Sequence, residues 1–240
     1  MNLELVRIPT GEGTIAALDY EPRRARGVGL VVGHGYSSSK HNLDFLCAFL
    51  ASHGYRVVSI DFQGHKLGAS GGVLRSPDDL VTAMLAAVRY ARERYGPATY
   101  ALGHSMGATA ALRACAADSE IAGAVSIAAG YGRLSALRAL RGAAVVDLRS
   151  SYVEGLTLPE LAERTEPLVD AALAGLAGRP VLYVAAQHDM MVSPSSAREL
   201  FERAPEPKAF VTIESDHTSA GENARSAVLG WLNALHPRAT

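Results

Sequence analysis

Cysteine is scarce in this sequence of 240 residues, which contains only Cys47 and Cys115. The chain has no CxxC motif and no cluster of cysteine and histidine, so neither a disulfide framework nor a zinc site is indicated. Both cysteines lie in segments with a helical pattern, and we predict buried free thiols that pack like small apolar side chains. We expect no metal ion and no organic cofactor.

The chain also lacks a surplus of charge of either sign. It has 23 lysines and arginines against 24 aspartates and glutamates, which gives a formal net charge of −1. Proteins that bind nucleic acid or an anionic membrane surface usually carry a clear basic excess, so neither partner is expected. The sequence leaves a homodimer open.

Long apolar runs are absent as well. The longest, such as residues 27–32 and 121–129, are far shorter than the about 20 residues that span a bilayer. The first residues, MNLELVRIPT, carry an early acid and no apolar core of a secretory signal. With 48% hydrophobic and 20% charged residues, the composition predicts a globular cytoplasmic protein without integral membrane association.

Eight segments have the pattern of β-strands. In residues 3–8 and 14–20 polar and apolar residues alternate, and a Gly-Glu-Gly turn separates the two segments, which predicts an antiparallel pair at the edge of a sheet. The other segments are continuously apolar, as parallel strands buried on both faces should be. They cover residues 27–32, 56–60, 98–102, 123–128, 180–185 and 209–214.

Helical patterns alternate with these strands. The clearest covers residues 77–95, with Ser76 as its predicted N-cap and Pro77 at the first helical position. Alternating buried strands and amphipathic helices predict an α/β fold, in which a mostly parallel eight-stranded sheet carries helices on both faces. We expect a single domain over residues 1–240. The other helical segments are residues 41–53, 106–117, 195–203 and 222–235.

Residues 131–178 interrupt the alternation. About fifty residues separate the strand that ends near Gly130 from the strand that begins at Pro180, which is more than a crossover connection needs. We predict that this stretch forms a small helical lid, and a plain connecting helix with a long loop is the alternative. Its apolar residues include Leu134, Leu137, Leu140, Val145, Val146, Leu148 and Leu156.

The strongest local motif is Gly103-His104-Ser105-Met106-Gly107. It follows an apolar strand and opens an alanine-rich helix, which is the setting that a G-x-S-x-G nucleophile elbow requires. Glycines on both sides of the serine remove side chains that would collide in so tight a turn. We therefore predict that Ser105 is a nucleophile.

A serine hydroxyl needs a base that takes its proton, and the chain offers eight histidines. His217 follows the last predicted strand, and the carboxyl ends of parallel strands are where such sheets place their chemistry. His217 is therefore the predicted base. His104 is expected to point away from the serine, and His41 and His65 are weaker alternatives.

The acid should lie between the serine and the histidine in the chain, because folds with this elbow order the triad as Ser, acid, His. Asp189 follows the strand of residues 180–185 and is the predicted acid, which orients the imidazole. Asp216 is adjacent to His217, so its carboxylate is poorly placed to meet that ring. The remaining candidates lie in the predicted lid: Asp147, Glu154 and Glu166.

Two backbone amides are needed to hold the oxyanion. The amide of Met106, the residue after the nucleophile, is the first predicted donor. The second should come from the glycine-rich loop Gly33-His34-Gly35-Tyr36, where small residues allow a close backbone approach, and Tyr36 is our choice. We expect its side chain to line the acyl site.

These motifs together resemble the α/β-hydrolase superfamily. The resemblance rests on His34-Gly35-Tyr36, Asp61-Phe62-Gln63-Gly64-His65, the elbow at Ser105, His188-Asp189 and Asp216-His217, in that order. It spans nearly the whole chain and is strongest to a branch that holds serine aminopeptidase-like proteins, monoacylglycerol lipase-like enzymes and small bacterial esterases. It implies Ser105, Asp189 and His217 as the triad and Tyr36 and Met106 as oxyanion donors. The chain departs from the family pattern after Asp61, with Gln63 for an arginine and Lys66 for a glycine.

The predicted function is the hydrolysis of small carboxylic esters through an acyl-enzyme intermediate. The alternatives are a monoacylglycerol lipase or a thioesterase, then a peptidase, and last a binding protein on a hydrolase frame. A peptidase would need carboxylates near the site to hold a substrate amine, and the lid contains Glu154, Glu160, Glu163 and Glu166. The expected partner is a small acyl ester.

Overall fold

The computed structural model describes residues 1–11, 13–96, 98–132 and 143–237, and its centre is an eight-stranded sheet. The strands follow the order β1-β2-β4-β3-β5-β6-β7-β8, in which β2 pairs antiparallel with β1 and β4 and all other pairs are parallel. The strands are β1 (Asn2–Thr10), β2 (Gly13–Glu21), β3 (Val28–Gly33), β4 (Arg56–Ile60), β5 (Ala98–His104), β6 (Gly123–Ile127), β7 (Val181–Ala186) and β8 (Lys208–Ile213).

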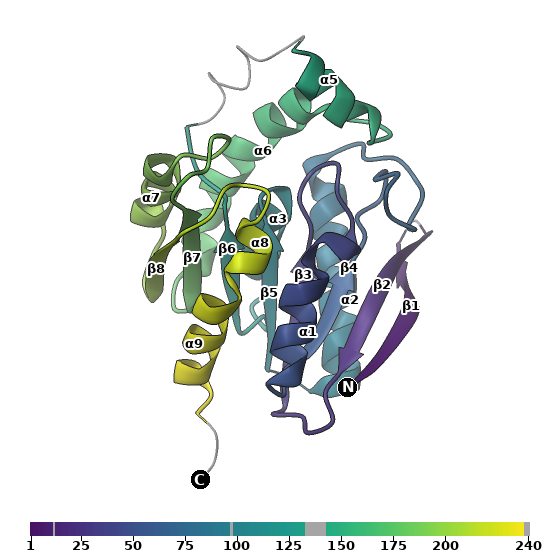
Figure 1. Cartoon of the computed structure of the whole chain (residues 1–240), viewed down its shortest axis with the longest axis vertical. Coiled ribbons are helices and arrows are strands. Elements are labelled where there is room, and N and C mark those ends of the chain that lie inside the picture. The colour runs from purple at the N-terminus through teal and green to yellow at the C-terminus, as the bar shows by residue number, and fades with distance from the viewer. Residues whose placement is uncertain (12, 97, 133–142, 238–240) are drawn as a thin grey trace.

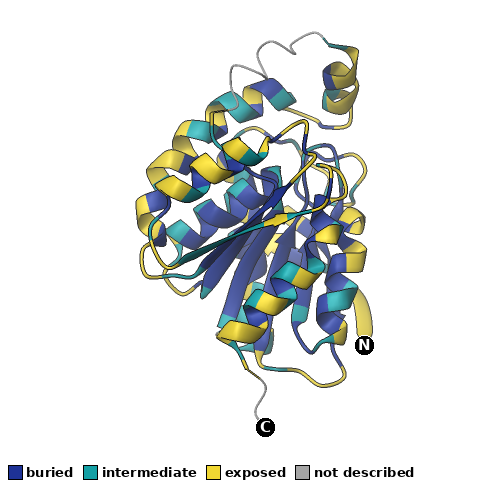
Figure 2. Cartoon of the chain, turned by 60° about the vertical axis from the view of Figure 1, so that its left-hand side comes forward, coloured by how far each residue is buried: buried dark blue, intermediate teal, exposed yellow. Residues whose placement is uncertain are grey.

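This arrangement confirms the predicted α/β fold with a mostly parallel sheet. Every residue of β3, β6 and β7 is buried, because helices cover both faces and leave no polar side to these strands (Figure 2). β1 at the edge is mostly exposed. The difference explains why continuous apolar runs and alternating patterns both led to correct strand predictions.

Helices pack on both faces of the sheet (Figure 1). On one face lie α1 (Asp44–Ser52) and α9 (Arg225–Leu235), whose buried residues share a core cluster with Leu30, Val32 and Leu102. On the other face α2 (Pro77–Tyr95) and α3 (Met106–Ala117) share a cluster with Val31 and Ala101. α7 (Pro194–Arg203) packs beside β7 and β8, and its Leu200 belongs to this second cluster.

The helix boundaries differ from the predicted ones at two places. The segment predicted over 41–53 begins with a 3₁₀ turn, η1 (Lys40–Leu43), because the Lys40 amide and ammonium both turn toward the carboxylate of Asp61. The last predicted helix is divided at Ala224 into α8 (Ala220–Asn223) and α9. The predicted N-cap Ser76 is confirmed, since its hydroxyl accepts a hydrogen bond from the Asp78 amide.

The long connection between β6 and β7 is helical where the structure describes it. We call residues 143–176 the cap segment; they form α5 (Ala144–Ser151), α6 (Leu158–Ala172) and η2 (Leu173–Leu176). α6 and η2 pack against α3 as a crossover helix would, whereas α5 lies beyond the end of the sheet (Figure 1). Residues 133–142, which include the predicted lid residues Leu134, Leu137 and Leu140, lie outside the described residues.

The two cysteines behave as the sequence predicts. Cys47 in α1 and Cys115 in α3 are buried and free, and burial raises the pKa of both thiols. Across the described parts of the chain, no helix combines the length and apolar character needed to cross a bilayer.

Candidate active site

Ser105 stands in a sharp turn between β5 and α3. Its backbone has φ 53° and ψ −113°, a strained conformation for a residue with a side chain, and its amide is fixed by a 2.8 Å hydrogen bond to the Ile127 carbonyl. A Cβ at Gly103 would lie 2.1 Å from the carbonyl of Gly107, and a Cβ at Gly107 would lie 2.2 Å from the Gly33 oxygen. Both glycines are therefore required by direct backbone contact.

Ser105, His217 and Asp189 form a continuous hydrogen-bonded chain. His217 Nε2 lies 3.1 Å from Ser105 Oγ, and His217 Nδ1 lies 2.7 Å from Asp189 Oδ2. Each residue comes from a loop at the carboxyl end of a parallel strand: β5 for the serine, β7 for the aspartate and β8 for the histidine. The arrangement suits proton transfer from the hydroxyl to the imidazole, with the aspartate orienting the ring.

The Asp189 carboxylate is held on both oxygens. Oδ2 faces His217, while Oδ1 accepts the amides of Met191 at 2.8 Å and Val192 at 2.7 Å. Burial alone raises the pKa of this carboxyl, but the hydrogen bonds from His217 and the two amides outweigh burial and bring the pKa below its usual value. Asp189 is therefore an ionised, immobilised acceptor for the imidazole.

His104 supports the loop that carries His217. Its Nε2–H donates a 2.8 Å hydrogen bond to the backbone carbonyl of His217, and the two rings lie 5.0 Å apart. Burial lowers the pKa of His104 to about 4, with a further lowering from the charge of His217, so the His104 ring stays neutral near pH 7. Within the described residues, Ser105 Oγ is hydrogen-bonded to His217 and not to the His104 ring, in agreement with the expectation from the sequence.

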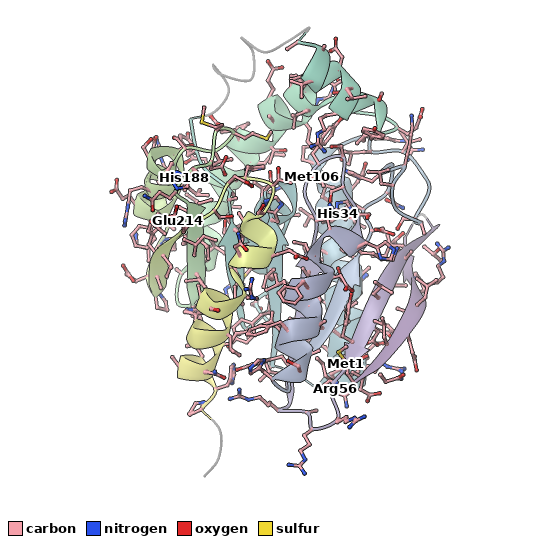
Figure 3. All side chains as sticks on the ribbon, viewed as in Figure 1. Met1, His34, Arg56, Met106, His188 and Glu214 are labelled. Carbon is pink, nitrogen blue, oxygen red and sulfur yellow. The ribbon has the colours of Figure 1, made fainter. Side chains whose placement is uncertain are left out.

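The residues predicted to hold the oxyanion, Tyr36 and Met106, both line the cavity beside Ser105. Met106 is the first residue of α3, where a backbone amide has no partner within the helix. Within the described residues, neither of the two amides donates to another backbone or side-chain group. Figure 3 shows Met106 and His34 at the end of the sheet beneath the cap segment, whereas Arg56 lies at the opposite end.

His34 fixes the peptide that precedes Tyr36. Its Nδ1–H donates to the Gly35 carbonyl at 2.8 Å, and its Nε2 accepts the Phe62 amide at 3.0 Å. Because the C=O and N–H of a trans peptide point in opposite directions, this bond leaves the Tyr36 N–H on the edge of the peptide away from His34. Burial lowers the pKa of His34 to about 3, with a further lowering by His65, so a neutral ring holds this peptide.

A buried ion pair stabilises the loop after β3, which carries His34 and Tyr36. Lys40 Nζ lies 2.6 Å from Asp61 Oδ2, and the two side chains are 3% and 0% exposed. Asp61 also accepts the amides of Lys40 at 2.7 Å and Ala69 at 2.8 Å. Burial alone would raise the pKa of Asp61, but the hydrogen bonds from Lys40 outweigh burial and lower the pKa. The carboxylate thereby ties the loop after β3 to the loop after β4.

A cavity of about 220 Å³ opens beside Ser105 and His217. Its apolar wall comes largely from α6, through Leu158, Leu161 and Val169. The polar lining residues include Ser37, Ser38 and Asn42 from the loop and 3₁₀ turn after β3, and Arg149 and Glu166 from the cap segment. The cavity can therefore take a small, partly apolar molecule next to the serine hydroxyl.

Sequence comparison identifies the family. A family model described as serine aminopeptidase, S33 matches residues 24–173, more than half of the chain. The chain belongs to this family of α/β-hydrolases. The predicted resemblance is thereby confirmed. Among curated proteins, none matches the chain significantly in sequence.

Several solved structures resemble this chain in fold over nearly its whole length. The esterase domain of a Rhodothermus marinus protein is 20% identical with a TM-score of 0.73, covering 98% of this chain and 99% of that one. The α/β hydrolase GrgF from Penicillium sp. sh18 is 18% identical with a TM-score of 0.75 and covers 98% of each chain. The Pyrococcus furiosus esterase Pf2001 is 19% identical with a TM-score of 0.72, covering 98% and 90%. At these identities the likeness concerns the fold.

The hydrolase chain brings the predicted site residues together and leaves the alternatives apart. Asp216 is exposed and accepts the Ser219 amide instead of meeting its neighbour His217. Glu154 lies 3.4 Å from Lys66, and Asp147 is exposed on α5. Glu166 lines the cavity, but Asp189 is the carboxylate that is hydrogen-bonded to His217.

His65 and Lys66, at the point where the sequence departs from the family pattern, do not line the cavity. His65 is 2% exposed and packs edge-on against His34, with ring centroids 4.9 Å apart. Lys66 reaches outward to α5, where its Nζ donates to the Ser151 carbonyl at 2.9 Å. The Lys66 side chain, which replaces a glycine of the family pattern, therefore links the loop after β4 to the cap segment.

Sequence reasoning missed three features of the site. The burial of Lys40 carried no signal, because a lysine in a polar loop is usually exposed. The hydrogen bond between the Tyr36 hydroxyl and the Leu156 carbonyl, at 2.9 Å, joins residues 120 positions apart. The presence of Arg149 at the cavity depends on how α5 is placed beyond the end of the sheet.

Proposed function

We propose that this chain hydrolyses small carboxylic esters through an acyl-enzyme intermediate on Ser105. The observation that carries the proposal is the hydrogen-bonded chain from Asp189 through His217 to Ser105, whose serine end lines a cavity together with Tyr36 and Met106. A nucleophile, its base and its orienting acid are then present together, with two amides beside them.

In the proposed reaction, Ser105 Oγ attacks the acyl carbon while His217 Nε2 accepts the hydroxyl proton. The amides of Tyr36 and Met106 hold the negative oxygen of the tetrahedral intermediate. His217 then gives its proton to the departing alcohol, which breaks the ester bond and leaves the acyl group on Ser105. Water repeats the sequence on the acyl-enzyme, releases the carboxylic acid and restores the serine.

The size of the cavity favours short acyl groups over long ones. About 220 Å³ is below the roughly 300–1,000 Å³ that is usual for sites that bury drug-sized ligands. This limit supports a small-ester hydrolase before a monoacylglycerol lipase. A thioester of a short acyl group would fit the same space, and direct assay separates it from the oxygen ester.

A peptidase is less well supported by the side chains around the cavity. Of the four glutamates that could hold a substrate amine, Glu166 is the one that lines the cavity within the described part of the chain. Glu160 is engaged at the start of α6, where it accepts the Thr157 amide at 2.9 Å. Glu154 faces Lys66 on the outside of the molecule.

The test is turnover of an ester series together with labelling of the serine. We expect purified protein to hydrolyse p-nitrophenyl esters of two to six carbons faster than longer esters, thioesters and aminoacyl amides. A fluorophosphonate should label Ser105 in the wild type and not in Ser105→Ala, which should fold normally and lose at least about a thousandfold in kcat. Unchanged turnover by Ser105→Ala, or a preference for amides, would overturn the proposal.

A further inference from the structure

The cavity beside Ser105 contains one cationic side chain among its described lining residues, Arg149 on α5. Within the described part of the chain, its guanidinium has one hydrogen bond, a long one of 3.4 Å from Nη1 to Ser37 Oγ. A guanidinium has five N–H donors, and a neutral hydroxyl at this distance satisfies one of them weakly. Arg149 is exposed, so donors that meet no described residue are open to solvent and to a molecule that enters the cavity.

The surroundings of Arg149 are built from the same loop that carries Tyr36. Ser37 is 2% exposed and has φ 55°, so its hydroxyl is held in place by a fixed backbone. Ser38 and Asn42 line the cavity as well and can supply further donors. Glu166 is the acidic side chain among the described lining residues, and it already takes part in another interaction.

We propose that Arg149 binds a carboxylate carried by the substrate, so that the preferred esters are acidic ones. A guanidinium matches the two oxygens of a carboxylate with two parallel hydrogen bonds. Among the described lining residues one arginine is present, and it balances a single negative charge, which fits a carboxylate better than a phosphate dianion. The inference rests on the proposed ester hydrolysis and names its substrate class.

The reaction itself is unchanged by this assignment. Ser105 still forms the acyl bond and the alcohol still leaves with the proton from His217, while the second carboxylate stays ionised against Arg149. The carboxylate can sit on the acyl chain, as in a half-ester of a dicarboxylic acid, or on the alcohol. Two substrate pairs distinguish these sources: mono-p-nitrophenyl adipate against p-nitrophenyl hexanoate, and carboxymethyl butyrate against ethyl butyrate.

The test compares kcat/KM within each pair, after subtraction of spontaneous hydrolysis. We expect the wild type to favour the acidic member of one pair about tenfold, because charge-assisted hydrogen bonds at a partly exposed site contribute modestly. Arg149→Gln should remove this preference, mainly through KM, and Arg149→Lys should restore part of it. The preference should also decrease at high salt, since exposed charges are screened.

Arg164→Gln is the matched control. Arg164 lies on α6, does not line the cavity, and makes a similarly long hydrogen bond of 3.4 Å, to the Arg75 carbonyl. This variant should keep the wild-type preference. Equal acidic preference in Arg149→Gln and wild type, or an equal decrease for both members of a pair, would overturn the inference.

Failure of the inference can be separated from failure of the proposed function. If neutral esters are hydrolysed and Ser105 is labelled but no acidic preference exists, the inference alone is wrong. If no ester is hydrolysed, binding of adipamate and hexanamide by calorimetry gives the same comparison without turnover. Tighter binding of adipamate that is lost in Arg149→Gln supports the anion site, and equal binding overturns it.

Discussion

The loops at the strand ends and the cap segment of residues 143–176 meet at one cavity but are built differently. In the loops, Ser105 is fixed by the Ile127 carbonyl, and Asp189 is fixed by two backbone amides. In the cap segment, α5 buries one residue, Val146, and leaves Val145 and Leu148 61% and 56% exposed. Figure 2 shows buried strands at the centre of the molecule and many exposed residues on the outer helices.

This difference indicates that the strand-end loops and the cap segment have different roles in the proposed site. Groups that must hold a reacting geometry sit in the loops directly after the strands, where backbone hydrogen bonds limit the movement of Ser105 and Asp189. Residues 152–156 of the cap segment are joined to the loop after β4 by backbone hydrogen bonds, such as the one from the Glu154 amide to the Gly64 carbonyl at 2.8 Å. Side chains add further contacts with the strand-end loops, among them Tyr36 with Leu156, Arg149 with Ser37 and Lys66 with Ser151. Changes at the strand ends should therefore affect turnover by orders of magnitude, and changes at the cap contacts by small factors.

The largest effect is expected from Asp189→Asn. The asparagine oxygen can still accept the Met191 and Val192 amides, so the fold should survive. Its NH₂ group would face His217 Nδ1 and favour the wrong tautomer of the ring, and kcat should decrease about ten-thousandfold. The measurement is kcat for p-nitrophenyl butyrate together with the melting temperature.

Asp216→Asn is the control for this variant. Asp216 is adjacent to His217 in the chain, but its carboxylate is exposed and accepts the Ser219 amide. Its kcat should stay within about a factor of two of the wild type, as is typical of a surface substitution. Similar losses in both variants would contradict the assignment of the acid.

A second prediction concerns stability in acid. Burial lowers the pKa of His34 to about 3 and of His104 to about 4, so both rings are neutral in the folded protein well below pH 6.5. The unfolded chain binds their protons from about pH 6.5 downward, and the free energy of unfolding should decrease as pH falls. The decrease is about 1.4 kcal/mol per pH unit for each histidine, until the pH reaches its folded pKa.

Urea unfolding at pH 7.5, 6.0 and 4.5 measures this dependence. In the His104→Gln variant the change between pH 6.0 and 4.5 should be smaller, even if the variant is less stable at every pH. A wild-type unfolding free energy that stays constant from pH 6.0 to 4.5 would show that these rings are protonated in the fold, and the neutral-ring account of the loops would be wrong.

The sequence predicted the strands and strand-end motifs better than the contacts of the cap segment. The strands and the elbow at Ser105 were predictable, because continuous apolar runs and the glycines of a tight turn are visible as short patterns in the sequence. The cap contacts were not predictable, because each joins distant segments whose approach depends on the assembled fold. Tyr36 was chosen for its amide, and no pattern in the sequence indicated that its hydroxyl meets Leu156.

Tyr36→Phe tests this contact and should have a moderate effect. The ring is kept, but the hydrogen bond to the Leu156 carbonyl is lost, and the backbone that carries the Tyr36 amide is held less firmly. One neutral hydrogen bond corresponds to about two- to tenfold in an equilibrium or rate. We expect kcat and the rate of fluorophosphonate labelling to decrease together by that factor, while KM changes less.

Tyr152→Phe provides the comparison for Tyr36→Phe. Tyr152 follows α5 in the cap segment and is 36% exposed, and it does not line the cavity. This substitution should leave kcat and the labelling rate at wild-type values. Equal decreases in the two variants would mean that loosening the cap in general, and not the contact with Leu156, affects the site.

The smallest effect on stability is expected from Lys66→Met, and it is the sharpest test of whether the two regions are energetically separate. Lys66 Nζ donates to the Ser151 carbonyl at the end of α5, and the Lys66 and Glu154 side chains are 52% and 61% exposed. An exposed pair of this kind contributes about 0–1 kcal/mol, so the global free energy of unfolding should hardly change. Hydrogen exchange in α5 should nevertheless become faster, because the last turn loses a capping cation.

Glu154→Gln keeps the bond to Ser151 and should leave exchange in α5 unchanged. If Lys66→Met instead accelerates exchange in β5 and β6 as well, then the cap and the sheet open as one cooperative unit. The site and the cap would then differ in solvent exposure but not in local stability.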